Sequence, residues 1–150
     1  MKGNLYTGRL FQRLEEMESK VKTIKIDKAK YSGFLKKAKE FISSMEDDLA
    51  KERWNSACLN AIHSAISAND ALLACFHGIR SISPKHDDAV RLLISLFKTE
   101  EARKNAEHLQ ELIRRKNLLE YQDKLFSGSD AGTLSKHARR FLEWAQSILP

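Results

Sequence analysis

The sequence predicts an all-α protein, an up-and-down bundle of five to six helices. Two observations carry this prediction. The 150 residues include only six glycines and two prolines, so the chain offers few points at which helices must end. Along most of the chain, apolar residues recur at steps of three and four, which is typical of amphipathic helices, and no segment indicates a sheet.

Length and composition indicate one domain. A chain of 150 residues rarely forms two independent cores, and a hydrophobic fraction of 42% is too high for a disordered chain. We expect residues 27–150 to form the bundle and residues 1–26 to be an N-terminal helical extension. Within that extension, a leading helix is expected inside residues 5–22, followed by an extended connector at residues 24–26.

Two long helices are expected to begin the bundle, the first of them capped by Asp27. The first has a regular apolar stripe: Phe34, Leu35, Ala38, Phe41, Ile42, Met45 and Leu49. The second, from about Lys51 to His77, is apolar over more than half of its circumference and carries small residues opposite. Such a helix is usually central in a bundle or packed against a second subunit. Gly78 is expected to end it.

After a loop at residues 79–85, three further helices are expected. They cover residues 86 or 87 to 97, residues 100 to about 125, and a last helix through Ile148. Thr99 could cap the second of these. Residues 127–132 are interpreted as a turn, in which Asp130 or Thr133 could cap the last helix.

Targeting signals and disulfides are not expected. The longest apolar run, residues 71–76, is far shorter than the roughly 18 to 20 residues that span a bilayer, and no secretion signal begins the chain. We therefore expect a cytoplasmic protein without a membrane partner. Cys58 and Cys75 would lie about 25 Å apart in one helix, too far to pair, and are interpreted as small buried side chains.

Metal and cofactor motifs are missing from the sequence. It contains no Glu-x-x-His, His-Glu-x-x-His or Cys-x-x-Cys, so no metal site is expected. Its glycines are scattered, which excludes a phosphate-binding glycine-rich loop, and there is no Gly-x-Ser-x-Gly elbow to present a serine nucleophile. We expect no cofactor.

The positive charge is concentrated near the start of the bundle. The net charge is +6, and residues 20–39 hold eight lysines against the single acid Asp27. Such a run is usually a solvated face, but it is also compatible with contact to nucleic acid.

Two sets of polar residues interrupt the apolar patterns. His63, Asp70 and His77 recur every seven residues on one side of a helix, at about 10 Å per step, and could line a groove or lie at a helix or subunit interface. In the helix expected from residue 100 to about 125, helical angles bring Asn117 and Glu120 toward the interior. Buried polar groups there are costly unless they form hydrogen bonds. The alternative there is an ion pair between Lys116 and Glu120.

The order of these features resembles the HEPN family, the "higher eukaryotes and prokaryotes nucleotide-binding" helical domains. The resemblance covers about residues 28–149. It rests on a long helix rich in alanine and small residues ending at Gly78, a loop with Arg80 and His86, an Arg-rich stretch ending in Glu120-Tyr121, and a closing helix rich in alanine and phenylalanine.

The resemblance implies a helical bundle that commonly forms a homodimer. Many members are metal-independent endoribonucleases, several of them toxins paired with a small nucleotidyltransferase-type protein, while others bind RNA, nucleotides or proteins. Active members carry an Arg, four to six variable residues and then a His. Carried onto this chain, Arg115 or Arg114 fills the Arg position and Lys116 the polar position after it, but Glu120 stands where the His is expected. A carboxylate repels the phosphate that it must approach, so the resemblance implies a degenerate catalytic pair, Arg115 and Glu120.

Three hypotheses follow from the residues and the resemblance together. The leading one is a HEPN-like dimer that binds a nucleotide, an RNA or a protein partner. Its cleft would be lined by the following residues: His63, Asp70, His77, Arg80, His86, Arg114, Lys116, Asn117 and Tyr121. The second is a metal-independent endoribonuclease of toxin–antitoxin type. The third is a pure protein-interaction scaffold.

Overall fold

The computed structural model describes residues 21–121, 123 and 125–150, and of residues 119–121 it describes the backbone only. The leading helix expected within residues 5–22 therefore lies outside the described residues, apart from Val21 and Lys22, which are not helical. The role expected for residues 1–26 as an extension stays a prediction.

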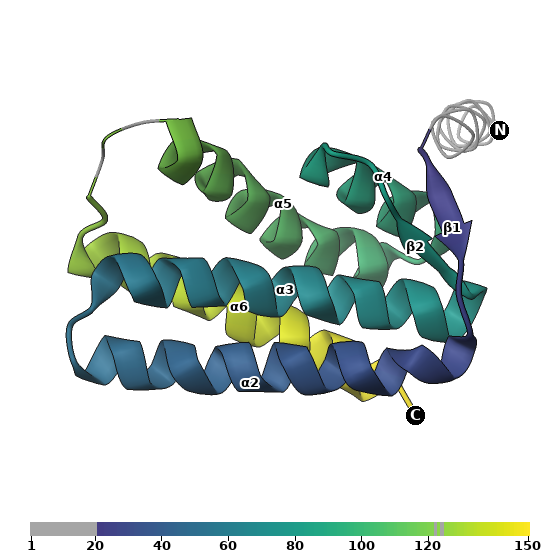
Figure 1. The fold of residues 1–150 in the computed structure, drawn as a ribbon, viewed down its shortest axis with the longest axis horizontal. Helices are drawn as coiled ribbons and strands as arrows, with labels where there is room; N and C mark the ends of the chain where they lie inside the picture. The colour runs from purple at the N-terminus through teal and green to yellow at the C-terminus, as the bar shows by residue number, and fades with distance from the viewer. Residues whose placement is uncertain (1–20, 122, 124) are drawn as a thin grey trace, which may run out of the picture.

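The all-α prediction is confirmed, with five α-helices in the described part of the chain. They are α2 (Tyr31–Ala50), α3 (Trp54–His77), α4 (His86–Leu96), α5 (Glu100–Tyr121) and α6 (Gly128–Ile148), preceded by a 3₁₀ turn, η1 (Lys28–Lys30). Figure 1 shows α2, α3, α5 and α6 alternating in direction, with the short α4 lying between α5 and the β1–β2 ribbon. No helix among the described residues is long and apolar enough to cross a bilayer.

Helix α3 is the centre of the bundle. It packs against each of the other four described helices, and thirteen of its 24 residues are buried. Its small side chains allow this, because alanines and serines let neighbouring backbones approach closely from several sides. Both cysteines are free, as expected; Cys58 is buried as expected, whereas Cys75 is only partly buried. Burial raises the pKa of the Cys58 thiol to about 11.

The prediction of no sheet is wrong in one place. Strands β1 (Thr23–Lys25) and β2 (Ile79–Ser81) form an antiparallel ribbon in which Ile24 is opposite Arg80. Gly78 ends α3 with a left-handed φ of 61°, as expected of a C-terminal glycine, and its carbonyl accepts a hydrogen bond from Ile26 N at 2.9 Å. Three-residue strands contain too little alternation to be seen in the sequence.

The expected turn over residues 127–132 is also wrong, because α6 begins inside it. Ser127 is the N-cap: its hydroxyl accepts a hydrogen bond from Asp130 N, and the Asp130 carboxylate accepts one from Ser127 N, which completes a capping box. Gly128 then lies against the ring of Trp54, where a Cβ would come within 3.2 Å of a ring carbon. The glycine thus marks a close packing contact and not a break in the helix.

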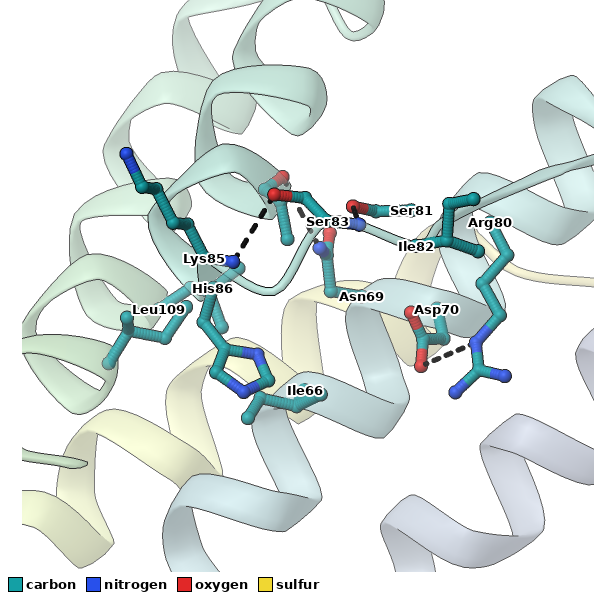
Figure 2. Close-up of a pocket in the computed structure, with 12 residues that line it drawn as sticks. Ile66, Asn69, Asp70, Arg80, Ser81, Ile82, Ser83, Lys85, His86 and Leu109 are labelled. Carbon is teal, nitrogen blue, oxygen red and sulfur yellow. Dashed lines mark hydrogen bonds and ion pairs between the residues drawn. The ribbon is translucent and has the colours of Figure 1, made fainter. Parts of the chain in front are cut away.

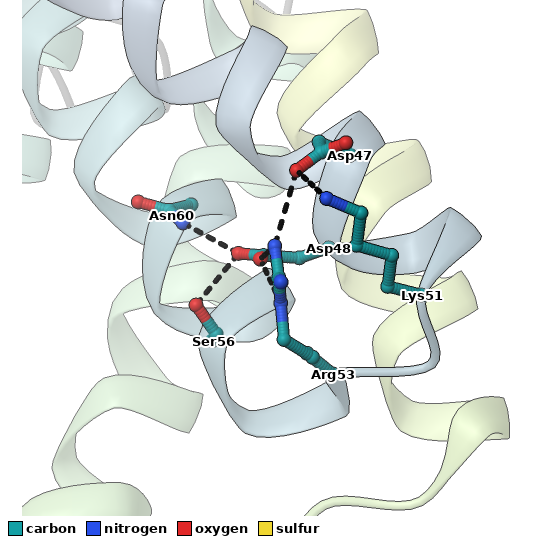
Figure 3. A network of polar contacts seen from close by, with 6 residues as sticks. All are labelled: Asp47, Asp48, Lys51, Arg53, Ser56 and Asn60. Carbon is teal, nitrogen blue, oxygen red and sulfur yellow. Dashed lines mark hydrogen bonds and ion pairs between the residues drawn. The ribbon is translucent and has the colours of Figure 1, made fainter.

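The connection between α2 and α3 is fixed by a buried carboxylate. Asp48, which is 4% exposed, accepts hydrogen bonds from Arg53 Nε at 2.7 Å, Ser56 Oγ at 2.6 Å and Asn60 Nδ2 at 2.8 Å (Figure 3). These bonds, first from Ser56, lower the pKa of Asp48. The start of α3 is thereby held against the end of α2, at Trp54 instead of the expected Lys51.

Candidate ligand pocket between α3, β2 and α4

A pocket of about 270 Å³ opens where α3, β2 and α4 meet, and we call it the α3–α4 pocket (Figure 2). It is lined by residues of α3, β2, the loop after it, α4 and α5: Ile66, Asn69, Asp70, Arg80, Ser81, Ile82, Ser83, Lys85, His86, Ala89, Leu109 and Ile113. Its lining therefore combines apolar side chains with hydrogen-bond acceptors and cationic groups.

The loop that forms one wall is held by its own serines. Ser83 Oγ donates to the Asp88 carboxylate at 2.6 Å and accepts from Lys85 N at 3.2 Å, while Ser83 N donates to Ser81 Oγ at 3.3 Å. Because Asp88 belongs to the first turn of α4, these bonds tie the loop after β2 to the start of that helix. The pocket wall is thus built by the local chain.

Two neighbouring residues of α3, Asn69 and Asp70, line the pocket and carry acceptors that are not fully used. Asn69 is 1% exposed, and its Nδ2 donates to Ala89 O at 3.4 Å, which orients the amide. Its Oδ1 is buried and accepts no hydrogen bond from any described residue. Asp70 lies 3.6 Å from Arg80 Nε, a distance for an ion pair but too long for a good hydrogen bond. Two acceptors with unused capacity therefore line one small cavity.

The electrostatics of Asp70 reflect its burial. Desolvation raises the pKa of its carboxyl to about 6, against the opposing attraction of the Arg80 and Lys37 charges. Arg80 itself is about half exposed and lies over the Phe34 ring, 5.4 Å from its centroid. Figure 2 shows the Asp70–Arg80 pair at one end of the pocket and His86 at the other, with the Lys85 side chain directed away from that pair.

Of the nine residues expected to line one cleft, the structure brings together Asp70, Arg80 and His86. His63 instead packs against the Phe41 ring, with centroids 5.4 Å apart, and His77 packs edge-on against Phe97 at 5.5 Å. Neither histidine lines the α3–α4 pocket, so the seven-residue spacing in α3 does not place the two histidines in that pocket with Asp70.

The Arg-rich end of α5 also lies away from the pocket. Arg114 pairs with Glu111 at 2.8 Å, and Arg115 lies 3.7 Å from the same carboxylate. The prediction that Asn117 points inward is wrong: Asn117 is exposed and Lys116 is the buried residue, at 9% exposed. Lys116 follows Ile113 and Leu112 at helical steps of three and four, so the buried face runs through it.

The remaining two expected residues cannot be placed. The side chains of Glu120 and Tyr121 lie outside the described residues, and so does the ion pair considered between Lys116 and Glu120. The catalytic pair of Arg115 and Glu120 stays a prediction.

Sequence reasoning missed Asn69, although it lies beside Asp70. A single asparagine in a run of alanines and serines gives no signal of its own, and the pocket needs β2 and α4, which are distant in sequence, to enclose it. The only available signal was the polar pair Asn69-Asp70 on a helix whose neighbouring residues are small and apolar.

The fold and the pocket together define a helical-bundle domain with a ligand-sized polar cavity beside its central helix. The family model described as HEPN domain matches residues 31–148, and the chain belongs to the HEPN family. The search of curated proteins and the search of solved structures each found no match.

A second stretch of α5 has the Arg–His spacing of active family members. Arg103, eleven residues before the Arg-rich run at Arg114, is followed by four residues and then His108. The two side chains line different surface hollows: Arg103 lies with Lys98 and Glu107, and His108 with Arg140.

Proposed function

We propose that this protein is a nucleotide- or RNA-binding HEPN module that works as a homodimer and holds its ligand in the α3–α4 pocket. The observation that carries the proposal is the meeting of unused acceptors, Asn69 Oδ1 and Asp70, with the cationic Arg80 in one cavity that apolar side chains also line. A nucleotide offers the matching set: a flat base with polar edges, and a phosphate.

Each part of the pocket has a stated task in this proposal. Ile66, Leu109 and Ile113 provide an apolar surface for the base. Arg80, held over Phe34 but half exposed, binds the phosphate or stacks on the base. The lysines of the segment before and within the start of α2 attract the ligand to this end of the molecule, so binding should weaken with salt.

The test is a direct titration in EDTA. A fluorescently labelled single-stranded RNA and, separately, guanosine and adenosine 5′-monophosphates are titrated against the wild type and Arg80→Gln. Arg80→Gln should weaken binding about tenfold, because a charge-assisted contact to phosphate is lost. The control is Lys136→Gln, which removes the same charge from an exposed position on α6 outside the pocket. Equal weakening by both variants would reduce the effect to net charge and remove the pocket from the proposal.

The homodimer is supported by the family, whose members often dimerise. Light scattering on a sizing column distinguishes a mass of one chain from a mass of two. A monomer at all concentrations that bind ligand would contradict this part of the proposal. The partner protein that we propose is of nucleotidyltransferase type. Co-expression with the products of neighbouring reading frames tests whether such a protein binds this chain.

A second function, metal-independent RNA cleavage, is favoured by the Arg103–His108 spacing. Incubating single-stranded RNA with the wild type, Arg115→Ala, Arg103→Ala and His108→Ala in EDTA separates the two pairs. Cleavage lost in Arg103→Ala and His108→Ala would assign it to that pair, and cleavage lost in Arg115→Ala would assign it to the Arg-rich end of α5. Intact RNA in every sample supports binding without chemistry.

The scaffold hypothesis makes a different prediction. Neutralising Arg114 and Arg115 should then change assembly without changing affinity for any nucleotide. In the proposed module, those residues lie outside the pocket and substitution leaves nucleotide affinity unchanged, so the discriminating result is whether the wild type binds nucleotide at all.

A further inference from the structure

We propose that the α3–α4 pocket recognises guanine, with Asp70 and Asn69 Oδ1 accepting hydrogen bonds from the N1–H and the 2-amino group of the base. This inference rests on the proposed function and names the base that the pocket selects. Its basis is the energetic cost of a buried acceptor that has no donor. Asn69 Oδ1 is buried with no donor among the described residues, and a buried acceptor left unsatisfied destabilises the folded protein unless a ligand satisfies it.

The amide cannot escape this cost by turning over. Its Nδ2 faces Ala89 O, and exchange of the two atoms would put an oxygen against that carbonyl oxygen. The next residue, Asp70, adds a carboxylate whose side chain is 14% exposed and whose contact with Arg80 at 3.6 Å leaves its oxygens free to accept. The pocket therefore requires a ligand that brings at least two donors.

The charges around the pocket exclude a cationic donor. Arg80 and Lys85 line it, His86 faces it from α4, and the Lys37 charge of α2 also acts on Asp70. An ammonium or guanidinium ligand would be repelled by these groups. A neutral donor attached to an anionic phosphate satisfies both the acceptors and the surrounding cations.

Among the bases, guanine alone presents two adjacent donors. Its N1–H and 2-amino group lie side by side, whereas adenine and cytosine pair an amino donor with a ring acceptor, and uracil has one N–H between two carbonyls. The Asp70 carboxylate can accept from both guanine donors at once, which leaves the second hydrogen of the 2-amino group for Asn69 Oδ1. A good bidentate pair of this kind separates bases by about tenfold or more. The volume of about 270 Å³ is large enough for a base.

The experiment is calorimetric titration of the full chain with guanosine, inosine and adenosine 5′-monophosphates at pH 7.5. We expect guanosine monophosphate to bind about tenfold tighter than adenosine monophosphate, with inosine monophosphate, which lacks the 2-amino group, in between. Asp70→Asn should remove the preference, because the amide replaces one acceptor oxygen with a donor. Asp87→Asn, an exposed carboxylate on α4 outside the pocket, should keep it.

Further measurements distinguish guanine in an RNA strand from a free nucleotide. They also distinguish failure of this inference from failure of the proposed function. The RNA trinucleotides UGU and UAU, titrated in the same way, show whether guanine is read within a strand or as a free nucleotide. Circular dichroism melting verifies that Asp70→Asn is folded. Nucleotides that bind without preference for guanine would overturn the inference and keep the proposed function, whereas no binding of any nucleotide would overturn both.

Discussion

The imidazoles of His108 on α5 and His137 on α6 meet with their Nδ1 atoms 2.9 Å apart. One Nδ1–H must donate a hydrogen bond and the other Nδ1 must be unprotonated to accept it. Two imidazolium rings, in which both nitrogens are donors, therefore cannot keep this contact. Burial is the largest cause that lowers the pKa of each ring, and the charge of nearby Arg140 adds to it.

This contact predicts a loss of stability in mild acid. Because both pKa values are lower in the folded chain than in the unfolded chain, the unfolded chain takes up protons first as the pH falls below about 6.5. The melting temperature should therefore drop between pH 7.5 and pH 6.0. His137→Gln should make that drop smaller. Thermal melts of the wild type and the variant at the two pH values measure the difference. An equal drop in the variant would contradict the assignment to this pair.

The buried carboxylate at the α2–α3 connection predicts a large effect from a small change. Asp48→Asn keeps the size of the side chain but leaves Arg53, Ser56 and Asn60 with a poorer acceptor, so the free energy of unfolding should fall by about 2 kcal/mol. Urea denaturation measures the fall.

A matched control stands one residue earlier. Asp47 is exposed and pairs with Lys51 and Arg53 at 3.1 Å, so Asp47→Asn should cost less than about 1 kcal/mol. Similar losses in the two variants would mean that burial does not decide the contribution of Asp48.

Two glycines predict opposite effects of the same substitution. Gly78 has a left-handed φ of 61°, and a Cβ there would lie 3.3 Å from Ile26 O, so Gly78→Ala should lower the free energy of unfolding by about 1 to 2 kcal/mol. Gly33 lies inside α2 with nothing within 4 Å of a built Cβ, and Gly33→Ala should raise that free energy by about 0.5 to 1 kcal/mol. Denaturant unfolding of both variants checks the two signs together.

The amide in the pocket predicts a conflict between stability and binding. Asn69→Leu removes the buried unsatisfied acceptor and should raise the free energy of unfolding by about 1 kcal/mol. The same change should weaken the guanine preference, because the 2-amino group loses Asn69 Oδ1 and keeps only the Asp70 carboxylate as an acceptor. Thermal melts and nucleotide titration of this one variant measure both effects; reduced stability with retained preference would contradict both.

Recognition of guanine through Asp70 also predicts a pH dependence. The carboxyl accepts two hydrogen bonds only when ionised, and its pKa of about 6 means that protonation begins just below neutral pH. The ratio of affinities for guanosine and adenosine monophosphates should therefore fall from pH 7.5 to pH 5. The ratio is the quantity to measure, because charge changes on the phosphate affect both nucleotides alike. A ratio independent of pH would argue against Asp70 as the acceptor.

The sequence was sufficient for the helices because their signal is local. The stripe from Phe34 to Leu49 and the small-residue composition of α3 repeat over many turns, and tertiary packing follows them. It was insufficient for the pocket. Asn69, β2 and His86 come together only after Gly78 turns the chain, and that placement depends on contacts between distant segments.

The error at the end of α5 has a simple geometric cause. A step of one residue rotates a helical position by about 100°, so small uncertainty in the axis of the buried face decides between Lys116 and Asn117. Polar residues near the boundary of an apolar stripe are where such predictions are least secure. The family resemblance met a similar ambiguity. Two stretches of α5, one at Arg103 and one at Arg114 and Arg115, each offer an arginine for the Arg position of the family's pattern.

The β1–β2 ribbon shows that the family match and the segment supporting the candidate pocket begin at different residues. The match to the family begins at residue 31, after β1, yet Ile24 is the residue that pairs with Arg80. A shortened chain starting at Tyr31 would retain all five described helices and lose the strand that steadies the arginine of the pocket. The matched domain thus begins after β1, and residues upstream of the match pair with β2, which lines the candidate pocket.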